Sequence, residues 1–342
     1  MSSEAIVFSD VHFGDPRSLL HNSSHFEKLL HLARQHRPIR RVVLPGDILD
    51  LQIGNWSMAI EGILQGVGGR RSVGFRRFLN ELVAEVGAKH VHFVPGNHDY
   101  RVFDYLSVDR YLMARLATGK RLHGTLSFYR HFRKPFLRGI LATTEVPFEV
   151  TYPHLELRLG DHRLVLGHGH YLDASQGLGV DAHRAFRNVH AKDTKAVAKA
   201  RQNFFRRVGL YQSIVDGGAV NYQVRQGVYR RAVGAVHAVT KLGDLTRGKA
   251  RGRAIDHGLK QNILAYVRFC CRGRKVDGFV FGHTHRAGET TISRPPEQPL
   301  RVWNCGTFLQ EKGAKSRVGS FLLLQSKKGA PLQELVRTLW ID

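Results

Sequence analysis

Short apolar stretches recur along the chain, and most of them stop at a cluster of polar residues. The first three occupy residues 5–9, 41–44 and 90–94, and segments with apolar residues at helical spacing lie at 24–36 and 73–86. Short apolar runs bounded by turn residues are typical of buried strands, and apolar residues at i, i+3 and i+4 are typical of helices. This alternation of strand and helix predicts an α/β sheet with helical crossovers.

The rest of the chain contains further strand-like stretches, separated by two long segments of another character. Continuous or alternating apolar residues predict strands at 155–159, 162–166, 276–281, 300–303, 320–324 and 332–340. Residues 101–117 read as helical, whereas 119–150 are basic and aromatic without a clear period. Residues 171–275 are too long for a loop, and apolar stripes at 224–239 and 263–271 predict that they are mostly helical.

The pattern predicts a core with one inserted cap. The core comprises residues 1–171 and 276–342, in which 101–150 form an irregular basic insertion, and residues 172–275 form the helical cap. Between Arg184 and Lys275 there are 21 Lys and Arg against four Asp, so this segment carries most of the net charge of +24.

A basic balance of this size, with a pI near 10.5, implies attraction to polyanions. Three explanations of the charge stay open: a lid that recruits an anionic membrane or a lipid-linked pyrophosphate, a nucleic-acid surface, and a solvated cationic face. Phe204 and Phe205, followed by Arg206 and Arg207, form an aromatic and basic cluster that suits base stacking or an amphipathic membrane contact. We favour the lid.

Composition excludes several classes of protein. No apolar run approaches the ~20 residues that span a bilayer, and the N-terminal residues lack the basic segment of a signal peptide. The three cysteines, Cys270, Cys271 and Cys305, form neither a disulfide framework nor a zinc knuckle and point to a reducing compartment. We expect a cytoplasmic protein, peripheral on the inner face of the membrane if the cap is a lid.

Side chains that can bind metal ions follow nearly every predicted core strand. They are Asp10, His12, Asp47, Asn97, His168, His283 and His285. Because ligands bind beyond the carboxyl ends of strands in α/β sheets, these side chains are expected to converge. Carboxylate, imidazole and amide ligands without thiolate suit divalent Mn, Fe or Zn, and we favour Mn.

Seven ligands are too many for one open metal site. They fit two ions ~3.5–4 Å apart, with a bridging water that is hydroxide near neutral pH. Asp47 is the natural shared ligand, because its carboxylate has two oxygens and Gly46 allows a tight turn.

Five blocks of residues, taken together, resemble the calcineurin-like metallophosphoesterases. In order they are Asp10-Val-His12, Gly46-Asp47-Ile-Leu-Asp50, Gly96-Asn97-His98-Asp99, Gly167-His168 and Gly282-His283-Thr-His285. The resemblance implies a four-layer αββα sandwich of two mixed sheets flanked by helices, here with the mostly helical basic cap. It also implies hydrolysis of phosphoric esters or pyrophosphates.

The resemblance further implies a role for each residue. One metal ion would be held by Asp10, His12, Asp47 and His285, and the other by Asp47, Asn97, His168 and His283. His98 would stabilise the transition state or protonate the leaving oxygen, oriented by Asp99 or Asp50. In the fourth block His168 and His170 both lie at the strand end, and His168 is the preferred ligand.

Within the superfamily, the short Asp-x-His strand and the helical insertion are similar to the UDP-2,3-diacylglucosamine hydrolase branch. Typical members of that branch have Arg in place of His98 and Asp in place of His170. The expected substrate is a phosphorylated small molecule, such as a nucleotide sugar, or a lipid-linked pyrophosphate or phosphodiester. Two alternatives stay open: a nuclease that uses the basic cap, and a non-catalytic metal-binding scaffold.

Overall fold

A computed structural model describes most of the chain. The described residues are 2–51, 61, 64–65, 72–103, 106, 116–117, 130–133, 146–217, 255–271, 275–310 and 317–341. The predicted apolar stripe at 224–239 and most of the predicted basic insertion lie outside them.

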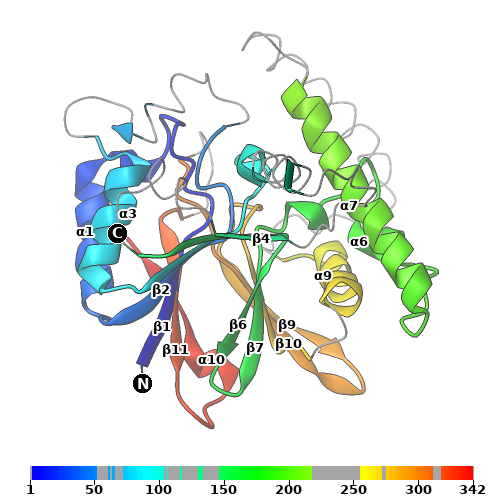
Figure 1. Ribbon diagram of the computed structural model, residues 1–342. Coiled ribbons are helices and arrows are strands. Elements are labelled where there is room, and N and C mark those ends of the chain that lie inside the picture. Colours follow the sequence, from blue (N-terminus) through cyan, green and yellow to red (C-terminus); the bar gives the residue numbers. More distant parts are fainter. Residues whose placement is uncertain are drawn as a thin grey trace.

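Two mixed sheets form the centre of the molecule (Figure 1). The first has the strand order β12-β11-β1-β2-β3-β5-β4 and the second β6-β7-β8-β10-β9. The first-sheet strands are β1 (Ser2–Val7), β2 (Ile39–Leu44), β3 (His90–Phe93), β4 (Arg130–Arg133), β5 (Phe148–Tyr152), β11 (Ser320–Ser326) and β12 (Val336–Trp340). The second-sheet strands are β6 (Leu155–Leu159), β7 (His162–Leu166), β8 (Gly278–Phe281), β9 (Gly288–Arg294) and β10 (Glu297–Asn304).

Helices cover the outer face of each sheet, so the molecule has four layers (Figure 1). On the first sheet lie α1 (Ser23–Arg34) and α3 (Phe75–Val86), and on the second lie α6 (Ala182–Ala185), α7 (Thr194–Gly217) and α9 (His257–Cys270). Three short helices complete the described elements: η1 (Leu19–His21), η2 (His170–Leu172) and α10 (Leu332–Leu335). The four-layer α/β architecture predicted from the sequence is confirmed.

Alternation of side chains along the strands explains why the sheets are covered on both faces. In β1, Ala5 and Val7 pack between the two sheets, whereas Ile6 packs under the outer helices. In β8, Val280 lies between the sheets and Phe279 faces the helices on the other side. Strands buried on both faces read as continuous apolar runs, which is the pattern seen in the sequence.

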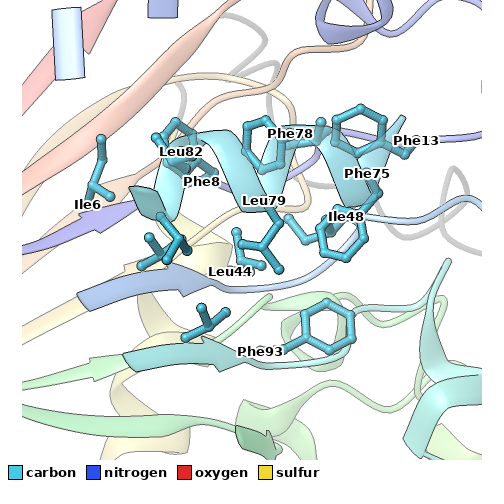
Figure 2. Packing of buried hydrophobic residues seen from close by; sticks show 14 of the residues in the cluster. Ile6, Phe8, Phe13, Leu44, Ile48, Phe75, Phe78, Leu79, Leu82 and Phe93 are labelled. Carbon is cyan, nitrogen blue, oxygen red and sulfur yellow. The ribbon is translucent and has the colours of Figure 1, made fainter. Parts of the chain in front are cut away.

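The apolar stripe of α3 explains how the first outer layer is held. Its Phe78, Leu79 and Leu82 are fully buried. Leu79 points toward Leu44 of the strand beneath (Figure 2), and Phe78 packs against the rings of Phe8 and Phe13. Residues at this spacing share one face of a helix, as the sequence pattern predicted for 73–86.

The helical part of the predicted cap packs on the second sheet. Ile263 and Val267 of α9 are buried in one cluster with Phe279 of β8, so α9 is the outer layer of that sheet. Phe204 and Phe205 of α7 belong to the same cluster and are 1% and 4% exposed. The interpretation of these two rings as a stacking platform or a membrane contact is therefore wrong, because they are core residues.

Four details of the secondary structure differ from the sequence predictions. Residues 130–133 and 148–150, expected to be irregular, form β4 and begin β5. In β5 the polar residues Glu149 and Thr151 are buried as well and hide the alternation. The predicted strand over 332–340 begins instead with α10, where Leu332 and Leu335 are both buried at helical spacing. Strand β9 was not predicted, because it is a polar strand at the edge of its sheet, paired with β10 alone among the described strands.

None of the helices in the described part of the chain combines the length and the apolarity that a membrane crossing needs.

Candidate metal centre

All seven predicted metal ligands lie in loops that follow strands of the two sheets. The loops after β1, β2 and β3 carry the ligands of the first sheet, and those after β7 and β8 carry the ligands of the second. Backbone hydrogen bonds join the first two loops: Asp10 N–H donates to Gly46 O at 3.0 Å, and His12 N–H to Asp47 O at 2.9 Å. These bonds extend the pairing of the parallel strands into the loops, and so fix how the side chains face one another.

Five of the predicted ligands have left-handed backbone conformations. They are Asp10, His12, Asp47, His283 and His285, with φ between 52° and 65°. Such conformations cost ~1–3 kcal/mol each in non-glycine residues and persist where the surroundings hold them, typically at functional sites. The bonds to Gly46 O and Asp47 O restrain Asp10 and His12, and His283 N–H donates to the Asp10 carboxylate at 3.0 Å.

Glycines next to the ligands leave room for the ligand side chains. Gly46 has φ 89°, and a Cβ at this position would overlap the ring of His168. A Cβ at Gly282 would likewise overlap the Asp10 carboxylate. The glycines of the Pro-Gly-Asp and Gly-His-Thr-His blocks are therefore required for close approach of the two sheets at this point.

One cluster of possible metal ligands joins Asp10, His12 and His285, whose ligand atoms lie within 4.8 Å of one another. His285 Nε2 is 3.3 Å from Asp10 Oδ1. The other carboxylate oxygen of Asp10 accepts a hydrogen bond from Ser9 Oγ at 2.5 Å, which holds the carboxylate in place. Burial alone would raise the pKa of Asp10, but the imidazoles of His168 and His285 lower it.

A second cluster joins Asp10, Asp47 and His168. His168 Nε2 lies 3.1 Å from Asp47 Oδ2 and 3.1 Å from Asn97 Oδ1. The remaining oxygen of Asp47 accepts a hydrogen bond from the backbone N–H of His98 at 2.8 Å. Asp47 therefore lies between the ligands of both sheets.

His98 lies against two carboxylates. Its Nδ1 is 3.3 Å from Asp50 Oδ1, and its Nε2 is 4.0 Å from Asp47 Oδ2. Burial lowers the pKa of His98, but these two carboxylates outweigh it and raise the pKa to about 9. Asp50 also lies 3.9 Å from Nδ1 of His12. Burial alone would raise the pKa of Asp50, but the imidazoles of His98 and His12 lower it well below its usual value.

Asp99, the other residue expected to orient His98, has a different position. Its Oδ2 accepts a hydrogen bond from the backbone N–H of Ile48 at 2.9 Å, and its Oδ1 accepts one from Gly96 N–H. The carboxylate thus ties the loop after β2 to the loop after β3. Burial, aided by the charge of Asp47, raises the pKa of Asp99 to about 7.

The two candidates of the fourth block occupy different positions. His168 is in the second cluster, whereas Nε2 of His170 lies 3.3 Å from the hydroxyl of Tyr152. Both rings are fully buried. Burial and the neighbouring His168 hold the pKa of His170 well below its usual value, so that its ring is neutral.

A sequence model of the calcineurin-like phosphoesterases matches residues 5–287. The chain belongs to this family. No curated protein matches it. The family assignment makes the chain a metal-dependent phosphoester hydrolase, and the strand-end clusters are its candidate metal ligands.

Similar solved structures are distant from this phosphoesterase. A single mutant of Vps29 from Entamoeba histolytica is 12% identical, with a TM-score of 0.33, over 98% of this chain and 96% of that chain. A conserved uncharacterized protein from Streptococcus pneumoniae TIGR4, described as a predicted phosphoesterase, is 11% identical, with a TM-score of 0.28 and 99% of each chain covered. Vacuolar Protein Sorting 29 from Cryptosporidium parvum is 11% identical, with a TM-score of 0.30, over 99% of this chain and 97% of that chain.

The residues of this phosphoesterase fit a divalent cation. Both ring nitrogens of His12 are buried and have no hydrogen-bond partner among the described residues. An unpartnered buried polar atom is costly, and a bound cation would remove that cost. Buried carboxylates, imidazoles and the Asn97 oxygen complete a donor set that suits divalent Mn, Fe or Zn.

One contact of the phosphoesterase was not predicted from its sequence. Asp173 Oδ2 lies 3.5 Å from Nε2 of His283. The side chain of Asp173 is 47% exposed. Partial desolvation raises its pKa, but hydrogen bonding and charge from His283, together with Ser175, lower it to about 2. Asp173 does not follow a strand and matches none of the family blocks, so nothing in the sequence distinguished it from other acidic residues.

Proposed function

We propose that this phosphoesterase holds two divalent ions that share Asp47. Asp10, His12 and His285 would hold one ion with Asp47, and Asn97, His168 and His283 would hold the other with Asp47. The observation that carries the proposal is the position of the Asp47 carboxylate, 3.1 Å from His168 and 3.9 Å from His12. A carboxylate between imidazoles of two sheets is suited to bridge two cations.

When bound, the two ions would supply Lewis acidity to activate a water and neutralise phosphoryl oxygens. His98 would act on the leaving group. Asp50, 3.3 Å from Nδ1 of His98, favours the protonated ring, and the ring would donate its proton to the leaving oxygen. Asp50 holds the charged ring of His98 in place through Nδ1.

The proposed substrate is a nucleotide-sugar or lipid-linked pyrophosphate or phosphodiester. Exposed cations along α6 and α7 support an anionic substrate or surface; they include Arg184, Lys195, Lys199, Arg206 and Arg207. Long-range attraction by such a face raises the local concentration of anionic groups and is weakened by salt. We propose an anionic membrane surface as the partner, because exposed lysines and arginines are attracted to anionic lipid headgroups.

The test is a hydrolysis panel with protein reconstituted in Mn. Nucleotide-sugar pyrophosphates, lipid-linked pyrophosphates, cyclic nucleotides, monoesters and single-stranded oligonucleotides are compared, with His98→Ala as the control for contaminating activity. We expect the pyrophosphates to be the best substrates, and salt-sensitive binding to anionic but not neutral liposomes. Preferred cleavage of oligonucleotides without liposome binding would establish the nuclease alternative instead. No hydrolysis of any class by protein with both ions bound would favour the non-catalytic scaffold.

A further inference from the structure

Asp173 links the metal centre to the helices of the predicted cap. It follows η2, and its two carboxylate oxygens have different partners. Oδ1 accepts a hydrogen bond from the backbone N–H of Ser175 at 2.8 Å, whereas Oδ2 lies 3.5 Å from Nε2 of His283. One oxygen is thus fixed by the local turn, and the other faces the ring.

The ring nitrogens of the three second-sheet histidines are used differently. Nε2 of His168 faces Asp47, and Nε2 of His285 faces Asp10, so both rings direct Nε2 into the ligand clusters. In His283 the same nitrogen faces Asp173, which belongs to none of the ligand clusters, so Nδ1 is the other ring nitrogen that a cation could bind. Metal-bound histidines generally donate their other ring N–H to a carboxylate or carbonyl, which fixes the tautomer.

We propose that Asp173 is a positioning residue that accepts the Nε2–H of His283 and thereby presents Nδ1 to the second cation. This inference rests on the proposed two-metal function. It adds a carboxylate from outside the five family blocks to the machinery of the site, and it gives the cap helices an influence on the binding of one ion.

Buried polar contacts hold the segment that carries Asp173. Asn262 of α9 donates through Nδ2 to Leu172 O at 2.9 Å, and its Oδ1 accepts from His183 N–H at 3.0 Å. Gln212 of α7 donates to the side chain of Gln176 at 2.6 Å, and both amides are buried. The segment is thus hydrogen-bonded at Leu172 before Asp173 and at Gln176 after it. Displacement of α7 or α9 would therefore move the carboxylate away from His283.

The test compares Asp173→Asn with Asp181→Asn. Asp181 caps α6 through the backbone N–H of Arg184 at 2.8 Å, and Asn is as good a helix cap as Asp. Stepwise binding of Mn is measured by competition with a chelator. We expect Asp173→Asn to weaken the second ion by about 10–100-fold and to leave the first unchanged. Asp181→Asn is expected to bind both ions like the unaltered protein, and Asp173→Glu to recover part of the loss.

Long-range ¹⁵N NMR of the zinc-loaded protein supplies a readout that does not depend on activity. We expect the His283 ring to carry its proton on Nε2 in the unaltered protein. A proton on Nδ1, or equal binding of both ions by Asp173→Asn, would overturn the inference. A fall in the melting temperature of the metal-free Asp173→Asn protein with loss of both ions would also overturn it, since the role would then be structural. One ion bound by the unaltered protein would contradict the proposed function instead.

Discussion

The two halves of the candidate metal centre are held in different ways. In the first-sheet half, the loops after β1, β2 and β3 are joined by backbone hydrogen bonds and by the Asp99 carboxylate. In the second-sheet half, which consists of His168, His283 and His285, the rings face carboxylates: Asp47, Asp173 and Asp10 respectively. A backbone hydrogen bond from Gly282 N–H to His168 O at 3.0 Å also joins the two second-sheet loops. What distinguishes the second half is that each of its rings faces a carboxylate from another segment, Asp47 and Asp10 of the first half and Asp173 after η2.

This difference indicates what each half needs in order to form. A backbone-bonded set of loops keeps its geometry when one side chain is changed. An imidazole oriented by a single carboxylate loses its orientation when that carboxylate is removed. Asp47 is the residue on which both halves depend, so it offers the largest expected effect.

Asp47→Asn should abolish activity and lower the metal content to at most one ion per chain. The substitution removes the shared negative charge and replaces one of the two acceptor oxygens near His168 with an NH₂ donor. We expect activity to fall by more than about 10⁴-fold, which is more than the loss of one acid–base group costs. Metal analysis and hydrolysis of an activated aryl phosphodiester measure the two effects. Retention of two ions would mean that Asp47 is not shared.

His98→Ala tests the chemistry of the first half alone. The ring is the proposed acid and not one of the proposed metal ligands, so we expect turnover to fall by about 10²–10⁴-fold with unchanged metal content. Turnover at saturating substrate and metal analysis are measured on the same preparation. Loss of an ion would show that His98 is a ligand.

Asp99→Asn tests how the first half is held together. An amide can accept only one of the two backbone hydrogen bonds from Ile48 and Gly96 without presenting its NH₂ to the other donor. We expect the free energy of unfolding to fall by about 1–3 kcal/mol, measured by urea denaturation of the metal-free protein. Unchanged stability with lost turnover would give Asp99 a role in catalysis rather than in the fold.

The fold and the first-sheet half could be predicted from the sequence because their signals are local. A buried strand is an apolar run, and the residues after it are adjacent in the chain, so Asp10, His12, Asp47 and Asn97 could be located from the pattern alone. The five blocks then indicated the family, which the sequence model confirmed.

The remaining features depend on contacts between distant segments, which no local pattern records. Asp173 meets His283 only after the second sheet and its helices have assembled. Phe204 and Phe205 look like surface residues beside two arginines, yet they pack against Phe186 and Tyr171 in the core. The assignment of Asp50 and Asp99 likewise needed the structure, because both carboxylates are close to His98 in the block pattern and only the position of each side chain distinguishes them.

The smallest expected effect concerns His21, whose ring contacts the loop after β1 at Gly14. Its Nε2 accepts a hydrogen bond from Gly14 N–H at 3.3 Å and its Nδ1–H donates to Val73 O at 3.0 Å, so the neutral ring is satisfied. Burial lowers its pKa below the ordinary 6.5. As the pH falls below 6.5, the imidazole of His21 is therefore protonated in the unfolded chain before it is protonated in the folded one. The free energy of unfolding should decrease as a result.

Urea denaturation between pH 7.5 and 5 measures this effect, with His21→Gln as the variant that cannot titrate. We expect its stability to fall less steeply with decreasing pH than that of the unaltered protein. Identical slopes would contradict this account of His21.

The most direct test of the central claim is the number of divalent ions bound by the unaltered protein. After removal of metal with a chelator and reconstitution with Mn, metal analysis should give two ions per chain, with Asp47→Asn retaining at most one. A single tightly bound ion in the unaltered protein, even after reconstitution, would contradict the account of two half-sites that share Asp47.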